Sequence, residues 1–162
     1  MATDGASNNE RLLAAARTDN EEMILEIFEK GGFDINYQDG LGNTALHYAA
    51  SRGSTDVLEH ILSHDECDVD PINRLEGATP LHLALQIKDQ ELREYIVDSL
   101  LEAGADTKIK DKNGDTALDL LRPGDEKIRA MIRKAQAEAS VSWADVASDG
   151  EGGEGSGSED ED

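Results

Sequence analysis

The chain has 162 residues, of which 38% are hydrophobic, and its 36 Asp and Glu against 15 Lys and Arg give a formal net charge of −21. The length suits one domain or one domain with a tail, and the charge argues against nucleic acid or an anionic membrane as the main ligand, because both repel a polyanion. Cys67 is the single cysteine, which excludes an internal disulfide, and neither a membrane-spanning apolar run nor a secretory signal is present. We therefore expect a cytoplasmic or nuclear protein.

A first helical unit follows a start, residues 1–8, that is predicted to be flexible. Residues 12–16 form an apolar run, and residues 23–28 place apolar side chains at helical spacing. Residues 32–36 close the unit with a short extended piece. This order predicts a helix, a turn, a second helix and a loop.

The same order then recurs three times with a clearer opening. The openings are Gly42-Asn43-Thr44-Ala45-Leu46-His47, Gly77-Ala78-Thr79-Pro80-Leu81-His82 and Gly114-Asp115-Thr116-Ala117-Leu118-Asp119. Their threonines lie 35 and 37 residues apart, which indicates an internal repeat. Each threonine is predicted to be a helix N-cap, whose hydroxyl accepts a hydrogen bond from an N–H group of the first turn. Asp39-Gly40 and Asn113-Gly114 are predicted to provide turns with positive φ, and Gly104 is predicted to follow the end of a helix.

These segments resemble the ankyrin repeat, through Thr79-Pro80-Leu81-His82, Gly104-Ala105-Asp106 and the period. The resemblance implies an all-α repeat fold, an α-solenoid of about four ankyrin repeats, each a helix-turn-helix with a β-hairpin loop. The repeat domain is placed at residues 9–138, with repeats at about 9–38, 39–73, 74–110 and 111–138.

Two departures from the family pattern mark the C-terminal half. Residues 90–100 lengthen the second helix of the third repeat by about four residues, or one turn. In the last repeat Asp119 replaces the usual His, and residues 122–125 replace the usual turn between the helices. A terminal repeat has no downstream neighbour, so a polar outer face is expected there.

The charge is unevenly distributed along the chain. Residues 1–107 hold seven basic and 22 acidic side chains, net −15, and residues 108–134 hold eight basic and five acidic ones, net +3. Residues 135–162 hold nine acidic side chains and no basic one, net −9. Because the end of the chain is rich in Gly, Ser, Asp and Glu, residues 139–162 are predicted to be a disordered acidic tail.

The resemblance also implies a partner-binding surface on the hairpin tips and the exposed side of each first helix. Transferred to this chain, that surface consists of Gln38, Gly40, Leu41, Asn43, Ser51, Arg52, Ile72, Arg74, Leu75, Glu76, Ala78, Gln86, Ile87, Lys110, Lys112, Asn113 and Asp115. Leu41, Leu75 and Ile87 are apolar at positions expected to be exposed, which agrees with a partner contact, although single exposed apolar residues are common.

The four histidines are candidates for metal binding or catalysis. His60 and His64 lie one helical turn apart, before Asp65, Glu66 and Cys67, and resemble a metal cluster, but an outer helix followed by a solvated loop is the favoured interpretation. In the family, His at the positions of His47 and His82 hydrogen-bonds the loop backbone. No nucleophile–base arrangement or phosphate-binding Gly loop is present in the sequence, so no enzyme activity, metal or cofactor is expected.

Residues after the repeats offer two further kinds of candidate site. Trp143 either caps the last helix or anchors a partner, since Trp is a favoured hot-spot residue. Four serines have an acidic residue three positions later, which resembles the sites of acidophilic kinases of the casein-kinase-two type: Ser142, Ser148, Ser156 and Ser158.

We therefore expect a monomeric protein that binds another protein and binds neither nucleic acid nor membrane directly. Its acidic tail and four repeats also resemble the fungal ankyrin-type escort proteins, dedicated chaperones that hold a very basic ribosomal protein until ribosome assembly. That resemblance implies a basic partner. Two alternatives remain: an adaptor or inhibitory subunit of a signalling or transcription protein, such as a kinase inhibitor, and an acidic histone-binding protein.

Overall fold

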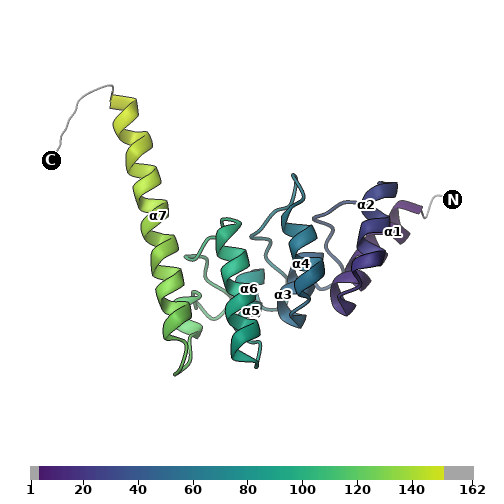
Figure 1. Ribbon diagram of the computed structural model, residues 1–162, viewed down its shortest axis with the longest axis horizontal. Coiled ribbons are helices and arrows are strands. Elements are labelled where there is room, and N and C mark those ends of the chain that lie inside the picture. Colours follow the sequence, from purple (N-terminus) through teal and green to yellow (C-terminus); the bar gives the residue numbers. More distant parts are fainter. Residues whose placement is uncertain (1–3, 152–162) are drawn as a thin grey trace.

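The computed structural model describes the backbone of residues 4–151 and the side chains of residues 8–140. Within these limits the chain forms seven α-helices and one 3₁₀ turn, and no segment of residues 4–151 forms a β-strand. The elements are α1 (Asp4–Thr18), α2 (Glu21–Lys30), α3 (Ala45–Arg52), α4 (Thr55–Leu62), α5 (Pro80–Ala84), α6 (Gln90–Glu102), η1 (Leu118–Leu120) and α7 (Glu126–Glu151). The helices stand in a row in chain order (Figure 1).

The row has two layers. The first helices of the units, α1, α3 and α5, pack against one another, and each second helix packs against the first helix of its own unit. α7 takes the place of a second helix and packs beside α6. This arrangement confirms the predicted all-α solenoid.

Apolar side chains at helical spacing form one core that runs through the whole row. The largest of the fully buried side chains come from all seven α-helices and from the position that follows α5: Leu12, Ile24, Ile27, Leu46, Leu58, Ile61, Leu81, Leu85, Ile96, Leu100, Ile128 and Ile132. Burying a side chain of this size contributes about 1.5–3 kcal/mol to stability.

The predicted N-caps at Thr44 and Thr79 are confirmed, and each belongs to a link between units. The Thr44 hydroxyl accepts from the His47 N–H, and the Thr44 N–H donates to His47 Nδ1 at 3.0 Å. Because Nδ1 accepts, Nε2 carries the proton and donates to the Ala78 carbonyl of the next unit at 2.9 Å. Burial holds the pKa of His47 below its ordinary value, so the ring stays neutral.

His82 repeats this arrangement in the third unit. Its Nδ1 accepts from the Thr79 N–H, and its Nε2 bonds the Asp115 carbonyl of the fourth unit at 2.9 Å. The two imidazoles therefore join three successive units through backbone carbonyls, which is the use that the family resemblance implies.

The fourth unit departs from this pattern, and the predicted N-cap at Thr116 is wrong. Only the short 3₁₀ turn η1 follows Thr116. The Thr116 hydroxyl donates to the Asp119 carboxylate at 3.1 Å instead of capping an α-helix. The same carboxylate accepts from the Thr116 N–H at 2.9 Å, as the histidines do in the earlier units. Pro123 disfavours helical backbone at Arg122, which limits the length of this first helix.

A buried ion pair joins the third and fourth units. Arg93 Nη2 lies 2.8 Å from Asp125 Oδ1, and the two side chains are 6% and 1% exposed. Arg93 Nη1 also donates to the Ile87 carbonyl at 2.6 Å, and Asp125 Oδ2 accepts from the Arg122 N–H at 3.0 Å. Because these partners satisfy both charges away from water, α7 is fixed against α6 at its first turn.

Both ends of the helical row extend further than the sequence predicts. α1 begins at Asp4 and not after residue 8, and Asn8 Nδ2 donates to the Gly31 carbonyl at 3.1 Å. α7 ends at Glu151, whereas the tail is predicted to begin at residue 139. Residues 135–139 are strong helix formers, and neither Gly nor Pro occurs between Asp125 and Gly150 to stop the helix. The predicted disorder of residues 152–162 lies outside the described residues.

Candidate functional site

Three hairpin tips, residues 38–43, 72–78 and 110–115, precede α3, α5 and η1. Each tip is closed by hydrogen bonds to one polar side chain. Asp39 Oδ1 accepts from the N–H groups of Leu41 and Asn43, both at 3.0 Å. Burial alone would raise the pKa of Asp39, but the hydrogen bond from the Tyr48 hydroxyl and those from the tip backbone hold it below its usual value. The carboxylate therefore stays charged and keeps the tip closed.

The other two tips use the same device. Asn73 Oδ1 accepts from the N–H groups of Glu76 and Ala78 at 3.3 and 3.0 Å. Asp111 Oδ1 accepts from those of Asn113 and Asp115 at 2.9 and 3.0 Å. All three tips are thus turns defined by a side-chain acceptor.

Neighbouring tips are also bonded to one another through the backbone. The Arg74 N–H donates to the Leu41 carbonyl and the Lys112 N–H to the Glu76 carbonyl, both at 2.9 Å. Gly42, with φ of 81°, makes this approach possible, because a Cβ there would lie 2.7 Å from the Arg74 nitrogen. The positive φ predicted for Gly40 is therefore found at Gly42, while that at Gly114 is confirmed at 83°.

Most of the predicted partner-binding residues lie on these tips, whereas Ser51, Arg52 and Gln86 lie at or just beyond the C-terminal ends of α3 and α5. We call the exposed ones the finger surface. Its exposed members are Gln38, Gly40, Leu41, Ser51, Arg52, Ile72, Arg74, Leu75, Glu76, Gln86, Lys110, Lys112 and Asn113. Asn43 is half-buried, and its Oδ1 accepts from Asn73 Nδ2 at 3.0 Å. Whether the finger surface binds a partner stays a prediction.

Ile87 does not belong to the finger surface. The sequence predicts an exposed side chain there, but it is 8% exposed and lies in the core. The Ile87 carbonyl accepts from Arg93, so the turn between α5 and α6 is folded inward around the buried ion pair. Trp143 lies within α7, where its side chain is outside the described residues.

The finger surface combines apolar and basic side chains. Leu41, Ile72 and Leu75 are 54%, 49% and 68% exposed. Its exposed charges are Arg52, Arg74, Lys110 and Lys112, against the single exposed acid of the tips, Glu76. The chain as a whole has net charge −21, so this surface has the opposite sign to the molecule.

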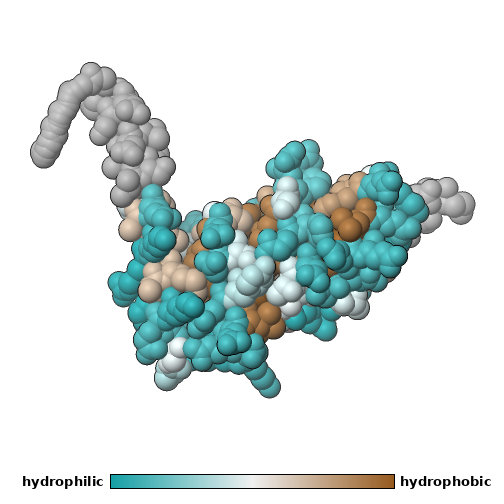
Figure 2. Space-filling model, in the orientation of Figure 1, coloured by the Kyte–Doolittle hydropathy of each residue, from teal (hydrophilic) through white to brown (hydrophobic). Residues whose placement is uncertain are grey.

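In the second layer, α2, α4 and α6 carry the opposite charge, which no single motif of the sequence indicates. The exposed charges of α7 within residues 126–140 are instead mostly basic: Lys127, Arg129, Arg133 and Lys134 against Glu126 and Glu138. We define the outer surface as the exposed side chains of residues 21–36, 55–70 and 90–106, which are α2, α4, α6 and the turns after them. It holds one exposed Lys, Lys30, and fourteen exposed acids: Glu21, Glu22, Glu26, Glu29, Asp34, Asp56, Glu59, Asp65, Glu66, Asp68, Glu91, Asp98, Glu102 and Asp106. Hydrophilic side chains cover most of the face drawn in Figure 2, with hydrophobic side chains in smaller areas between them.

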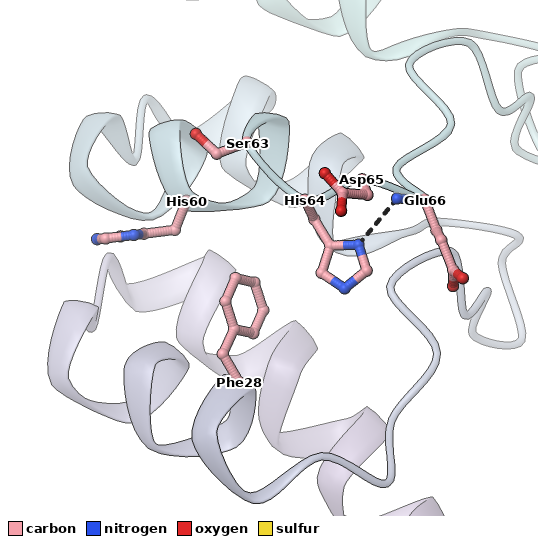
Figure 3. Close-up of a pocket in the computed structure, with 6 residues that line it drawn as sticks. All are labelled: Phe28, His60, Ser63, His64, Asp65 and Glu66. Carbon is pink, nitrogen blue, oxygen red and sulfur yellow. Dashed lines mark hydrogen bonds between the residues drawn. The ribbon is translucent and has the colours of Figure 1, made fainter.

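A hollow of about 510 Å³ opens on the outer surface between α2 and α4. Phe28, His60, Ser63, His64, Asp65 and Glu66 line it (Figure 3). The ring of Phe28 stacks on Phe33 with centroids 5.2 Å apart, and the His64 ring meets both edge-on. These three rings fix the end of α4 against the loop after α2.

The hollow brings together the residues that resemble a metal cluster in the sequence, but they have other partners. His60 Nε2 lies 2.8 Å from Glu21 Oε2, and His64 Nδ1 accepts from the Glu66 N–H at 3.1 Å. The two imidazoles lie on different sides of Phe28 (Figure 3). Burial, with the charge of Asp68, raises the pKa of Cys67 to about 11, so this thiol stays protonated at neutral pH. Among the residues described by the structure, no group of three or more His, Cys, Asp or Glu side chains is arranged to hold a metal ion.

Two of the four predicted phosphorylation sites fall within α7 and two beyond it. Ser142 and Ser148 belong to the helix, although their side chains are not described. Ser156 and Ser158 lie outside the described residues. Across the described part of the chain, no helix has the length and apolar character needed to cross a bilayer.

Comparisons with known proteins agree with the repeats seen in the structure. The family model described as ankyrin repeats, in three copies, matches residues 12–111. The ankyrin repeat-containing protein YGL242C of Saccharomyces cerevisiae is 38% identical over 137 residues, which cover 78% of this chain and 75% of that protein. The BCL-6 corepressor-like protein 1 of Homo sapiens is 30% identical over 141 residues, which cover 82% of this chain but 7% of that protein.

A bacterial protein gives a similar match. The putative ankyrin repeat protein YahD of Escherichia coli is 34% identical over 121 residues, which cover 73% of this chain and 60% of that protein. The chain thus spans most of a small yeast protein and a small part of a large human one. Ankyrin repeats form protein–protein interaction modules with extended binding surfaces. The chain belongs to the ankyrin-repeat family.

Proposed function

We propose that this chain is a non-catalytic interaction module that binds a basic protein and acts as its escort, a newly made ribosomal protein during ribosome assembly being one such partner. The observation that carries the proposal is the outer surface, with fourteen exposed acids and one exposed Lys. Residues 135–162 add nine acids and no base. A basic protein in the cytoplasm or nucleus would meet negative charge both on the outer surface and on residues 135–162.

The ion pairs of the described residues leave most of this charge free for a partner. Arg11 and Lys30 pair with Glu26 at 2.7 and 4.0 Å, and His60 Nε2 lies at hydrogen-bonding distance, 2.8 Å, from Glu21 Oε2. These contacts involve two of the fourteen exposed acids of the outer surface. Like-charged side chains that face solvent attract a basic protein over distance and raise its association rate.

An escort role follows from what this charge does to a basic protein. A basic segment that is free in the cell binds RNA through the phosphates without regard to sequence. An acidic module occupies the same Lys and Arg side chains until the partner reaches its assembly site. Phosphorylation of Ser142, Ser148, Ser156 or Ser158 would add about −1.5 to −2 charges per site and strengthen this binding.

Affinity capture from cells, with the full chain and with a chain lacking residues 145–162, tests the proposal. We expect a basic protein to be enriched by the full chain, to be lost as salt rises from about 50 to 300 mM, and to be enriched less by the shortened chain. If no basic protein is enriched, or if both salt and the deletion leave capture unchanged, the escort proposal is wrong.

The finger surface supports a second candidate function, that of an adaptor or an inhibitory subunit of a signalling or transcription protein, such as a kinase inhibitor. Leu41, Ile72 and Leu75 are about half or more exposed on it, and its net charge is positive. A partner held there would bind through apolar contacts, resist salt and not need the tail. A captured protein that survives high salt and tail deletion, and is lost on Leu41→Asp/Leu75→Asp, would establish this candidate.

A further inference from the structure

A continuous groove runs between α6 and α7 on the outer side of the array. Two adjoining hollows of about 450 and 230 Å³ make it up, and both are lined by Asp98 and Met131. The first extends to Glu91 and Lys127, and the second to Glu102 and Glu138. The groove therefore follows twelve residues of each helix, which is about 17 Å or three helical turns.

The floor of the groove is apolar. Tyr95, which is 45% exposed, and Leu101 contribute from α6, while Met131 and Ala135 contribute from α7. The Tyr95 hydroxyl donates to Glu59 Oε2 at 2.6 Å, so the ring is held in place from α4. Met and aromatic side chains are suited to contact with a partner because they offer a large apolar surface that adapts its shape.

The rim of the groove is acidic. Glu91, Glu94, Asp98, Glu102 and Glu138 face it, against Lys127 and Lys134. Five acids and two lysines give a net charge of −3. Lys127 lies 3.8 Å from Glu94, which also accepts from Gln90 at 3.2 Å, so Glu94 is engaged while Asp98 and Glu102 stand exposed at the middle of the groove.

This groove exists because of the two departures at the C-terminal end of the array. α6 has 13 residues and α7 has 26, whereas α2 and α4 have 10 and 8. The buried Arg93–Asp125 pair fixes the first turn of α7 beside α6. These two long, neighbouring outer helices thus leave a channel of about three helical turns between them. The hollow between the shorter helices α2 and α4 is instead confined to their C-terminal ends.

We infer that the groove between α6 and α7 binds an amphipathic helix of a basic protein. The apolar side of that helix would pack on Tyr95, Leu101 and Met131, and its Lys or Arg side chains would reach Asp98 and Glu102 on the rim. Helices dock in grooves of this kind through apolar residues spaced by three or four positions. The inference rests on the proposed function, for which it names the feature of the partner that is recognised.

The test uses the full chain and a synthetic helix-forming peptide of about fourteen residues, with Leu at positions spaced by three and four and Lys elsewhere. A second peptide has the same composition but its leucines are scattered so that no apolar face forms. We expect the first peptide to bind at least about tenfold more tightly than the second in fluorescence anisotropy, because only it fits the floor and rim together. Amide chemical shifts should change in residues 91–102 and 127–138.

A matched pair of charge reversals locates the binding. Asp98→Lys/Glu102→Lys should lower the affinity for the first peptide about tenfold, whereas Glu22→Lys/Glu29→Lys, which changes the net charge equally on α2, should lower it by less than about threefold. Thermal unfolding followed by circular dichroism confirms that both variants are folded. If either variant fails to fold, the chemical-shift changes of the natural chain still show where the peptide binds.

Three results would overturn the inference: equal binding of the two peptides, equal losses in the two variants, or shifts confined to residues outside α6 and α7. Failure of the groove is distinguishable from failure of the escort proposal. If a basic protein is captured from cells and Asp98→Lys/Glu102→Lys does not weaken its capture, the groove is wrong and the escort function stands. If no basic protein is captured, the escort function is wrong whatever the peptides do.

Discussion

The finger surface and the outer surface belong to the same repeats and carry opposite charge. The finger surface has four exposed basic side chains and one exposed acid, and its backbone is fixed by side-chain acceptors and by hydrogen bonds between tips. The outer surface has fourteen exposed acids and one exposed Lys. The net charge of −21 is therefore not a uniform coat, and the charge of a partner indicates which of the two surfaces it contacts.

The largest effect is expected when the buried Arg93–Asp125 ion pair, which holds α7 beside the acidic helix α6, is removed. Asp125→Ala leaves the Arg93 guanidinium buried without its charge partner, so we expect a loss of about 3–5 kcal/mol in the free energy of unfolding. Urea denaturation followed by circular dichroism measures it. Glu126→Ala, at the neighbouring exposed position, should change stability by less than about 0.5 kcal/mol. Similar losses in the two variants would mean that the buried pair does not hold α7 in place.

The next prediction concerns the finger surface. Gly42→Ala introduces a Cβ at positive φ and 2.7 Å from the Arg74 nitrogen, so we expect a loss of about 2–3 kcal/mol and separation of the first two tips. Gly40→Ala is the matched control on the same tip, because its Cβ would meet no atom within 4 Å. It should be neutral or stabilising by up to about 1 kcal/mol. Equal stability of the two variants would show that the tips are not packed as described.

A smaller effect is expected from pH, through the histidine that links the tips. Because the pKa of His47 is lowered in the folded chain, the unfolded chain binds more protons below the ordinary value of 6.5. The stability that depends on neutral His47 is complete above pH 6.5 and is lost as pH falls from there toward the lowered pKa. Urea titrations at pH 7.5 and 5.5 should show a larger drop for the natural chain than for His47→Gln. An equal or smaller drop would contradict the assignment of a neutral imidazole.

The smallest effect separates binding from stability. Leu75 is 68% exposed, so Leu75→Ser should change the free energy of unfolding by less than about 0.5 kcal/mol. Under the escort proposal it should also leave the affinity for a basic partner unchanged within about threefold, because Leu75 lies on the finger surface. If isothermal titration calorimetry shows that Leu75→Ser lowers the affinity tenfold or more, the partner binds at the tips and the escort proposal has the wrong surface.

Features that depend on local sequence were predicted well. The period of 35 and 37 residues, the caps at Thr44 and Thr79 and the left-handed Gly104 follow from residue type and spacing alone. The continuation of α7 past residue 138 was not predicted, although the sequence contains the signal for it: residues 135–139 favour helix, and neither Gly nor Pro follows before Gly150.

Features that depend on tertiary neighbours were missed or misplaced. Arg93 and Asp125 are 32 positions apart, and nothing in their own segments indicates that they meet in the core. Ile87 was predicted to be exposed because its turn was not known to fold around that pair. The outer surface and its groove required knowledge of which face of α6 and α7 points to solvent. Acids at helical spacing in residues 21–29, 56–59 and 90–102 were the signal that pointed to that surface.

The central claim is that the outer surface, together with the groove between α6 and α7, holds the basic partner, and that the finger surface does not. Hydrogen exchange of the full chain, alone and bound to the basic protein captured from cells, tests it most directly. We expect slower exchange on binding in α6 and α7, with lesser protection along α2 and α4, and unchanged exchange at residues 38–43, 72–78 and 110–115. Protection confined to those three tips, with none in the outer helices, would contradict the account.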